Sequence, residues 1–315
     1  MATVFIDGQA GTTGLEIAER LAPRRDIDLL TIDDAARKEP AARRALMEAA
    51  DVTILCLPDA AAVEAVALAD GVTRILDAST AHRTHPDWAY GLPELAPGQR
   101  QAIAGSERVS NPGCYPQGFI LMVRPLIEAG LLERSAHLSV FGLSGYSGGG
   151  RPMVDQYRAF LPAQAEAWNT RPYSLTLKHK HRPEMQRYAI LDNPPLFSPM
   201  VANYYRGMLI EVPLHAAQLS RKTSGEALAS LLAERYADEP FVEVLGFQPE
   251  AATDNGYLNA TETNGSNRIQ LMVFGNEAQF LLVARYDNLG KGASGAAVQN
   301  LNLMLGFEET LGLAA

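Results

Sequence analysis

One cysteine of the sequence, Cys114, lies among residues that shape the backbone. The segment reads SNPGCYPQGF over residues 110–119. Pro112 and Gly113 favour a turn, and Pro116 is typical of the first position of a helix. A thiol just ahead of a helix N-terminus meets unpaired N–H groups and the positive end of the helix dipole, which lower its pKa. The pattern predicts a cysteine nucleophile, and a buried structural cysteine is the alternative.

A pair of histidines, His179 and His181, is the second candidate for chemistry, in the segment KHKHRPE over residues 178–184. The residues before them, 173–177, predict a strand, on which the two imidazoles would point to the same side. Two histidines at this spacing can bind a metal, but a metal site needs at least three protein ligands and no third group is evident. Two interpretations of the histidine pair remain. It can be a general acid or base for Cys114, or it can be part of a basic surface patch. The basic neighbours also suit an anionic substrate.

Three glycines, Gly8, Gly11 and Gly14, form the third feature, with the spacing G-x-x-G-x-x-G. A short apolar strand is expected directly before them over residues 3–7, and apolar residues follow at helical spacing over residues 15–21. Such a strand, turn and helix can hold a phosphate, because glycine lets the backbone approach and the helix N-terminus attracts negative charge. An ordinary turn is the alternative, since this glycine string is a weak signal by itself.

The elements that must position these groups change in character along the chain. Before Cys114, short apolar strands alternate with helices, which predicts right-handed β-α-β crossovers and a parallel sheet. After it, the strands are longer and the pattern is more antiparallel. We therefore expect an α/β protein with a Rossmann-type parallel-sheet nucleotide domain (residues 1–113 and 288–315) and a mixed α+β domain (residues 114–287).

The expected elements can be stated by residue. The strands cover residues 27–32, 52–57, 74–77, 136–143, 173–177, 207–212, 268–274 and 278–286, and the helices cover residues 41–49 and 59–69. A terminal helix is expected from about residue 288, and its small residues suit close packing. The strands 268–274 and 278–286 predict a hairpin, because only a short turn containing glycine separates them.

The composition excludes several classes of protein. The chain of 315 residues is long enough for two domains with cores, and its net charge of −9 disfavours a nucleic-acid binder. No apolar run approaches the roughly 20 residues that cross a membrane. The 2 cysteines offer no disulfide framework, and the N-terminus shows no signal-peptide pattern, so a cytoplasmic protein is expected. Cys56 lies in an apolar run and is expected in the core.

These motifs together resemble the N-acetyl-gamma-glutamyl-phosphate reductase family. The segment NPGCYP over residues 111–116 is similar to the active-site signature of that family, and its short branch is the more similar one. The likeness extends to residues 8–14, YGLPEL (90–95), HKHRPE (179–184), YRGML (205–209) and DNLGKGASG (287–295). The family is grouped with the aspartate-semialdehyde dehydrogenases, in a fold group that resembles glyceraldehyde-3-phosphate dehydrogenase.

The resemblance implies a step of arginine biosynthesis. NADPH would reduce N-acetyl-L-glutamyl 5-phosphate to N-acetyl-L-glutamate 5-semialdehyde, and phosphate would be released. The Cys114 thiolate would form a thioester, which hydride would reduce by way of a thiohemiacetal. A histidine of the pair, by the resemblance His181, would move protons. The resemblance also implies a homo-oligomer, either a dimer or a tetramer, and a catalytic and dimerisation role for the domain of residues 114–287.

Two further sets of residues complete the expected site. Contacts to the substrate are expected from Gln117, Arg151 and Arg206, since arginine matches phosphate and carboxylate through paired hydrogen bonds. Contacts to NADP are expected from Gly8, Gly11, Thr12, Thr13, Gly14, Arg37 and Asn288. For Gln117, Arg151 and Arg206 the alternative is an ordinary surface residue, and no metal is expected.

The choice between NADP and NAD depends on a short polar segment. Asp33 and Asp34 lie 19 and 20 residues after Gly14. An acidic residue at that distance usually binds the ribose 2′-hydroxyl, which favours NAD. Arg37 and Lys38 follow closely and can neutralise a 2′-phosphate. Together with the family resemblance, this basic pair leads us to expect NADP.

Other functions are compatible with the same residues. The nearest is an aspartate-semialdehyde dehydrogenase, which performs the same chemistry on a smaller acyl phosphate, and a variant that acts on a carrier-bound substrate in lysine synthesis is another. From a different class, Cys114 and His181 can form a thiol hydrolase pair. A nucleotide-binding regulatory protein is the alternative without catalysis.

Overall fold

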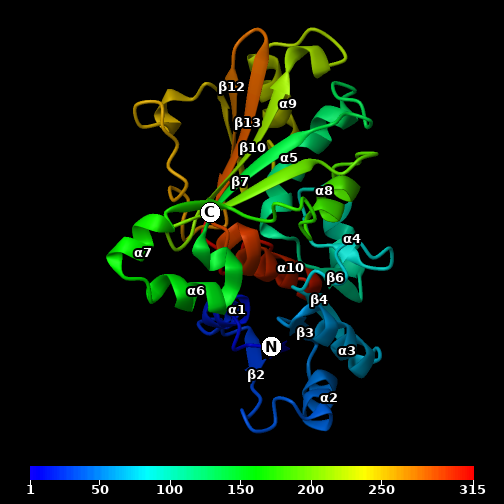
Figure 1. The fold of residues 1–315 in the computed structure, drawn as a ribbon. Coiled ribbons are helices and arrows are strands. Elements are labelled where there is room, and N and C mark those ends of the chain that lie inside the picture. The colour runs from blue at the N-terminus through cyan, green and yellow to red at the C-terminus, as the bar shows by residue number, and fades with distance from the viewer. The chain divides into compact units, whose positions relative to one another are not determined.

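The computed structural model describes residues 1–315, which fold into two compact units. The first unit comprises Met1–Pro112 and Ala293–Ala314, and the second comprises Gly113–Gly292 (Figure 1). The chain leaves the first unit after Pro112 and returns to it after Gly292. The boundaries expected from the sequence followed residues 113 and 287. The N-terminal and C-terminal parts of the chain therefore share one unit.

The first unit is built on a six-stranded sheet in the order β2-β1-β3-β4-β6-β5, and every neighbouring pair of strands is parallel. The strands are β1 (Ala2–Asp7), β2 (Ile27–Leu30), β3 (Val52–Leu55), β4 (Arg74–Asp77), β5 (Ala89–Tyr90) and β6 (Arg108–Ser110). The helices are α1 (Thr12–Leu21), α2 (Pro40–Ala49), α3 (Asp59–Ala69), α4 (Gln99–Gly105) and α10 (Gly295–Leu305). Sheets of this kind bind ligands beyond the carboxyl ends of their strands.

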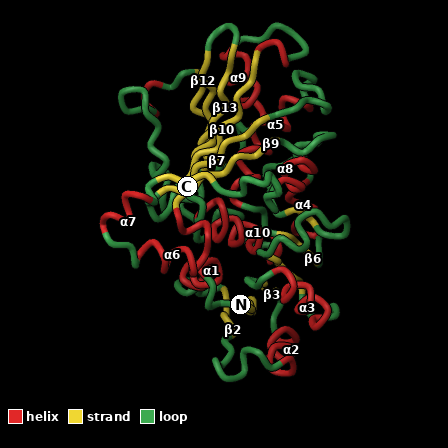
Figure 2. Tube along the Cα trace, in the orientation of Figure 1, coloured by secondary structure: helices red, strands yellow, loops and turns green.

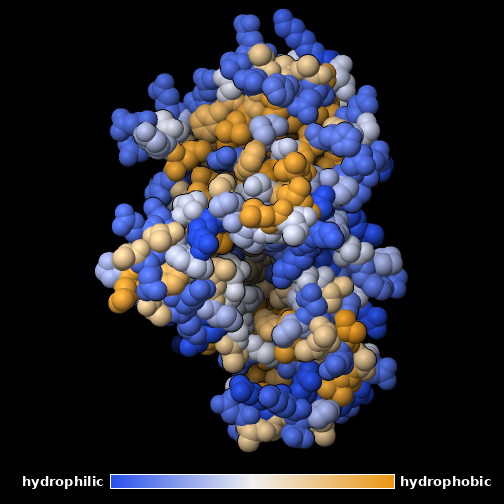
Figure 3. Space-filling view, in the orientation of Figure 1, coloured by the Kyte–Doolittle hydropathy of each residue, from blue (hydrophilic) through white to orange (hydrophobic).

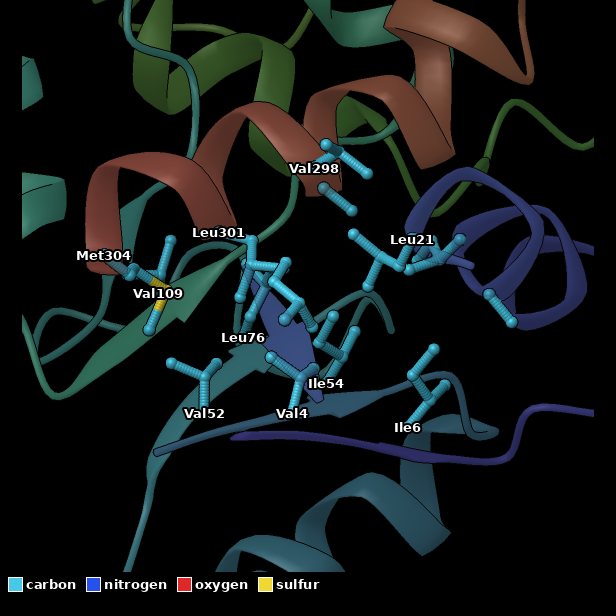
Figure 4. Close-up of a cluster of buried hydrophobic side chains, with 14 of the residues drawn as sticks. Val4, Ile6, Leu21, Val52, Ile54, Leu76, Val109, Val298, Leu301 and Met304 are labelled. Atoms are coloured by element: carbon cyan, nitrogen blue, oxygen red, sulfur yellow. The ribbon is translucent and has the colours of Figure 1, made fainter. Parts of the chain in front are cut away.

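Buried aliphatic side chains hold α1 and α10 against one face of this sheet. Val4, Ile54 and Leu76 project from three strands, and Leu301 of α10 packs over them (Figure 4). Because side chains alternate along a strand, Phe5 points to the opposite face, where α2 and α3 pack. Each such fully buried aliphatic side chain stabilises the unit by about 1.5–3 kcal/mol. The last helix of the chain thus supplies part of the core of the first unit.

The second unit is built on a seven-stranded mixed sheet in the order β11-β12-β13-β10-β7-β9-β8. Its strands are β7 (Ser139–Gly145), β8 (Thr170–Pro172), β9 (Leu196–Ala202), β10 (Met208–His215), β11 (Val242–Phe247), β12 (Ile269–Gly275) and β13 (Gln279–Tyr286). Its helices are α5 (Cys114–Glu128), α6 (Gly150–Arg158), α7 (Pro162–Ala167), α8 (Arg182–Tyr188) and α9 (Gly225–Arg235). No helix in either unit combines the length and the apolar character that crossing a bilayer requires.

The two faces of the second sheet are covered differently. The helices α5 and α9 pack on one face (Figure 2). On the other face, a loop over residues 252–260 packs against part of the sheet. Apolar side chains remain partly exposed on that face, among them Phe141 of β7 and Leu281 of β13. Figure 3 shows this apolar surface gathered over the sheet.

The predicted hairpin is confirmed, and its turn has a clear local cause. The strands β12 and β13 pair in antiparallel register from Ile269 opposite Tyr286 to Gly275 opposite Phe280. The side-chain oxygen of Asn276 accepts hydrogen bonds from the backbone N–H groups of Ala278 and Gln279. An asparagine that bonds its own turn in this way fixes the reversal.

One prediction about an element is wrong. Residues 173–177 form a turn, in which Ser174 and Leu177 have φ values of +53° and +56°, and the nearby strand β8 ends at Pro172. The terminal helix, expected from about residue 288, begins at Gly290 with a wider π-helical turn that continues into α10 at Gly295. The error at residues 173–177 lies where the local backbone departs from the conformations that periodicity can indicate.

Candidate active site

Cys114 is the first residue of α5 and follows the extended Gly113. No side chain caps this helix N-terminus, so the N–H groups and the dipole of the first turn act on the thiol. The segment after β13 lies against the cysteine, because a β-carbon placed on Gly292 would be 3.1 Å from the Cys114 β-carbon. A glycine at position 292 therefore lets the backbone approach the Cys114 side chain closely.

The phenol of Tyr286, the last residue of β13, fixes the first turn of α5. It donates a hydrogen bond to the backbone carbonyl of Cys114 and accepts one from the N–H of Gly118 at 3.1 Å. Tyr286 is completely buried. Burial is the main cause that raises the pKa of Tyr286 well above its ordinary value, and the nearby Cys114 is the second. The phenol therefore remains a donor at neutral pH.

Glu184 joins α5 to α8. Its Oε1 accepts a hydrogen bond from the backbone N–H of Gly113 at 2.7 Å, and the side chain is 1% exposed. His181, which is also buried, is the residue directly before α8. Its ring lies 5.9 Å from the ring of Tyr115, the neighbour of Cys114. The candidate nucleophile and the candidate acid or base thus stand at the N-termini of two helices that are hydrogen-bonded to each other.

His179 belongs to a chain of hydrogen bonds. Its Nδ1 accepts the backbone N–H of His181 at 3.2 Å, so the proton of the neutral ring is on Nε2. That Nε2 lies 3.4 Å from the phenol oxygen of Tyr173, whose hydroxyl donates to the Tyr115 hydroxyl at 3.3 Å. Burial is the main cause that lowers the pKa of His179 to about 4, and the charge of Lys180 is the second. The ring is therefore neutral at pH 7.

Gln117 lies on the first turn of α5 and is completely buried. Its side-chain nitrogen donates to the backbone carbonyl of Lys291 at 2.8 Å, while its Oε1 has no hydrogen-bond partner. Leaving a buried acceptor unpaired costs about 1–3 kcal/mol. A bound molecule with a hydrogen-bond donor would remove that cost.

Asn288 and Arg206 belong to one polar cluster. The Asn288 side chain accepts the N–H of Gly207 at 2.8 Å and donates to the Ser147 hydroxyl at 2.9 Å. The Arg206 guanidinium lies 3.4 Å from the carboxylate of Asp287, which is fully buried. The cluster joins the segment after β13 to the loops that precede β10 and follow β7, so the Asn288 amide is used within the protein.

Two of the expected site residues, Arg151 and Arg37, form only exposed ion pairs. Arg151 lies on α6, exposed, in an ion pair of 2.9 Å with Asp155 one turn further along. Arg37 follows β2, also exposed, and its guanidinium is 3.7 Å from the Asp34 carboxylate. Exposed pairs of this kind contribute about 0–1 kcal/mol, so either arginine can exchange its partner for a bound phosphate at little cost.

The glycine loop of the first unit is a tight turn between β1 and α1. Gly8 has a φ of +90°, and a β-carbon there would lie 2.5 Å from the backbone oxygen of Cys56. The start of α1 is formed by Gly11, as the residue before the helix, and by Thr12, Thr13 and Gly14. No side chain caps this N-terminus, so its backbone N–H groups remain to bind a phosphate.

An ion pair that the sequence analysis missed lies beside this loop. Asp7, the last residue of β1, accepts a hydrogen bond from Arg43 of α2 at 2.6 Å, and both side chains are largely buried. Strand alternation places Asp7 on the face that α2 covers. In the sequence, an aspartate directly before Gly8 is the only sign of this ion pair. It does not indicate that Arg43 is the partner.

The remaining candidates for chemistry are of a different kind. No three His, Cys, Asp or Glu side chains are arranged to hold a metal ion. Cys56 directly follows β3, and burial, then the charges of Asp77 and Asp7, raise its pKa to about 12. A thiol with that pKa is almost never a thiolate at neutral pH, so Cys56 is a poor nucleophile.

Comparison with known proteins first defines the class. The family model for the semialdehyde dehydrogenase dimerisation domain matches residues 114–288. Aspartate semialdehyde dehydrogenase II of Vibrio cholerae superimposes with a TM-score of 0.73 at 14% identity and covers 97% of this chain and 98% of its own. The enzyme of Francisella tularensis gives a TM-score of 0.73 at 14% identity, with 97% and 100% covered. The protein therefore has the semialdehyde dehydrogenase fold.

Relatives of higher identity define the family. N-acetyl-gamma-glutamyl-phosphate reductase 2 of Nostoc sp. is 50% identical over 317 residues, which cover 98% of each chain. The N-acetyl-gamma-glutamyl-phosphate reductase of Chelativorans sp. is 50% identical over 309 residues, with 96% of this chain and 98% of that one covered. The chain belongs to the N-acetyl-gamma-glutamyl-phosphate reductase family. The fold class and the family predicted from the sequence are confirmed.

His179 is expected to make stability depend on pH. Its pKa of about 4 in the folded protein lies below the ordinary 6.5, so the unfolded chain binds the proton more tightly. The free energy of unfolding should therefore rise with pH between about 4 and 6.5, and His179→Asn should flatten that rise. Urea unfolding across this range measures the slope. His137→Asn, at an exposed histidine, controls for the loss of an imidazole, and an unchanged slope in His179→Asn would contradict a buried neutral ring.

Proposed function

We propose that this protein is a cytoplasmic enzyme of arginine biosynthesis that uses NADPH to convert N-acetyl-L-glutamyl 5-phosphate into N-acetyl-L-glutamate 5-semialdehyde and phosphate. The observation that carries the proposal is the placement of Cys114 and His181 at two helix N-termini that Glu184 ties together. Relatives named for this reaction are 50% identical, whereas the aspartate semialdehyde dehydrogenases are 14% identical. The acetylated substrate is therefore favoured over an aspartyl phosphate.

Cys114 supplies the nucleophile. The N-terminus of α5 favours its thiolate, because the helix dipole and the N–H groups of the first turn stabilise negative charge. The sulfur attacks the acyl carbon, a C–S bond forms, and phosphate leaves with the electrons of the broken C–O bond. The product is a thioester on Cys114. Backbone N–H groups of the same turn stabilise the oxyanion that develops during the attack.

His181 moves the proton. When bound, NADPH supplies the hydride that reduces the thioester. His181 protonates the resulting oxyanion to give a thiohemiacetal, and it takes the proton back when the C–S bond breaks and the aldehyde forms. His179 is less suited to this role, because its Nδ1 accepts the His181 N–H and its pKa is only about 4. It orients the backbone of His181 instead.

The residues of the glycine loop fit a dinucleotide. The open N–H groups at the start of α1 would hold its phosphates, and the close backbone approach at Gly8 keeps side chains out of the way. Arg37, exposed and weakly paired, would bind the 2′-phosphate of NADP, with Lys38 beside it. Asn288 would contribute to cofactor binding indirectly, because its side chain holds Ser147 and the backbone of Gly207 in place.

Three side chains are proposed for the substrate. The unpaired Oε1 of Gln117 would accept a hydrogen bond from the acetylated substrate close to the thiol. Arg206 and Arg151 would bind its carboxylate and phosphate, since a guanidinium matches both groups through paired hydrogen bonds. Of the two arginines, Arg206 is better fixed, because the buried Asp287 holds it.

A homo-oligomer is proposed to form through the partly exposed face of the second sheet. Phe141 and Leu281 lie on this face, and between them Glu211 is partly buried. Burial raises the pKa of Glu211, as expected for a carboxyl group set among apolar side chains. The family model that matches this unit is named for dimerisation. A second copy of the chain would cover these apolar side chains, in a dimer or in a tetramer built from dimers.

Cys114→Ser should fold and lose nearly all turnover. Serine is close to cysteine in size, but its hydroxyl has a pKa far above neutrality, so a helix N-terminus cannot make it a competent nucleophile. The measurement is the reverse reaction, with N-acetyl-glutamate semialdehyde, NADP and phosphate, followed at the nicotinamide absorbance.

His181→Asn should lower the same turnover by roughly 10²–10⁴-fold, the usual effect of losing a general acid or base.

Cys56→Ser is the matched control for the cysteine. It should cost about 1–3 kcal/mol of stability through a poorly satisfied hydroxyl, and it should leave the activity per folded molecule largely intact. Substantial turnover by Cys114→Ser would exclude the thioester route.

NADPH should support a higher kcat/KM than NADH. Arg37→Ala should lower kcat/KM for NADPH by about tenfold or more, the equivalent of one lost charge-assisted hydrogen bond, and should leave the value for NADH almost unchanged. Arg134→Ala, at another exposed arginine in a weak ion pair, is the control. A preference for NADH in the unchanged protein would show that Asp33 and Asp34 set the specificity.

Phe141→Glu should dissociate the oligomer. The new carboxylate would lie beside Glu211 on the same face, so a second copy could cover the pair only at a large desolvation cost. Light scattering measures the mass of the particle in solution. Val63→Glu, at an exposed valine of α3, is the control and should keep the mass of the unchanged protein. An unaltered mass in Phe141→Glu would exclude this face as the interface.

A further inference from the structure

The Glu184 side chain accepts a hydrogen bond that differs from the one common for a glutamate in the first turn of a helix. Glu184 is the third residue of α8, and a glutamate there commonly reaches back to the N–H at the start of its own helix. Here its Oε1 accepts the N–H of Gly113, a residue 71 positions earlier that precedes a different helix. The side chain is 1% exposed, so this contact is made away from water.

The two ends of this bond lie next to the two reactive residues. Gly113 is joined directly to Cys114, and Glu184 stands on the first turn of the helix that His181 begins. Because a helical turn is stiff, fixing Glu184 also fixes the backbone of His181. A single bond of 2.7 Å therefore sets the position of one helix N-terminus relative to the other.

We propose that Glu184 is a positioning residue, whose carboxylate holds the N–H of Gly113 and thereby keeps the Cys114 thiol and the His181 ring in the arrangement that the reaction needs. The inference rests on the proposed function in that it takes these two residues as the reacting pair. Hydrogen bonds to an ionised acceptor are stronger than neutral ones, and this carboxylate also lies in the first turn of α8, where the helix dipole stabilises it.

The same carboxylate has a second, opposing effect. Its negative charge lies near the cysteine, because the carboxylate binds the N–H of the residue directly before Cys114. A nearby negative charge disfavours a thiolate, so Glu184 positions the sulfur while making it less acidic. The other titratable side chains around Cys114 are Tyr115, Tyr173, Tyr286, His179 and His181, with Lys291 on the segment that packs against it.

Two substitutions separate the hydrogen bond from the charge. Glu184→Gln keeps an acceptor oxygen for the Gly113 N–H and removes the charge, whereas Glu184→Ala removes both. Both variants should shift the pH midpoint of Cys114 alkylation by iodoacetamide downward by about one unit. Only Glu184→Ala should lower kcat of the reverse reaction, by about 10–10²-fold, because a small displacement of reacting groups costs that much. Peptide mass spectrometry distinguishes alkylated Cys114 from Cys56.

A matched control tests for a merely structural effect. Glu94 is also 1% exposed, lies in the first unit and accepts a hydrogen bond from Gln299. Glu94→Ala should leave both the alkylation midpoint and kcat unchanged. If Glu184→Ala does not fold, hydrogen exchange of the peptide that contains Gly113 replaces it as the readout. That exchange should be faster in Glu184→Asp, whose side chain is one methylene shorter, than in Glu184→Gln.

Two results would overturn the proposal. One is a folded Glu184→Ala protein with the kcat of the unchanged enzyme. The other is a loss of kcat in Glu184→Gln as large as in Glu184→Ala, which would assign the effect to charge and not to position. Failure of the proposed function would be seen separately, as turnover by Cys114→Ser, while alkylation and exchange would still report on Glu184.

Discussion

The backbone N–H of Gly113 donates to a carboxylate that is almost completely buried, and the site of the second unit depends on where that bond places α5. The Tyr286 phenol binds the next carbonyl along the chain, and Gly292 packs against the β-carbon of Cys114. Each contact requires α5 in one rotational position. Because nearly every side chain of α5 is buried, the helix cannot turn without disrupting the core. The geometry of the nucleophile is thus set by core packing.

Much of the fold could be predicted from the sequence, because local signals were strong there. Short apolar strands with helices between them indicated the parallel sheet, and α3 (Asp59–Ala69) and β4 (Arg74–Asp77) have the predicted bounds. The glycine loop after β1 and the cysteine between proline and glycine were visible for the same reason. Each of these features is specified by residues within one or two turns of the chain.

What could not be predicted depends on partners far apart in sequence or on unusual backbone. The bond from Glu184 to Gly113 spans 71 residues, and that from Asn288 to Ser147 spans 141, so no local pattern reveals them. Residues 173–177 look like a strand, but two non-glycine residues there adopt positive φ. Arg37, chosen for its charge, proved to be exposed, which charge alone cannot tell. Tertiary packing decides such details and leaves little local trace.

The contribution of α10 to the first unit has a consequence for synthesis on the ribosome. The strands that Leu301 covers are translated before the second unit, whereas their partner helix is translated after it. The second unit is continuous from Gly113 to Gly292, so it can complete its own core while the sheet of the first unit still lacks one of its covering layers. The second unit can therefore finish folding before the first, although most of the first unit is translated earlier. Until α10 has been translated, the strands of the first sheet lack the aliphatic side chains of α10 that help to cover one of their faces.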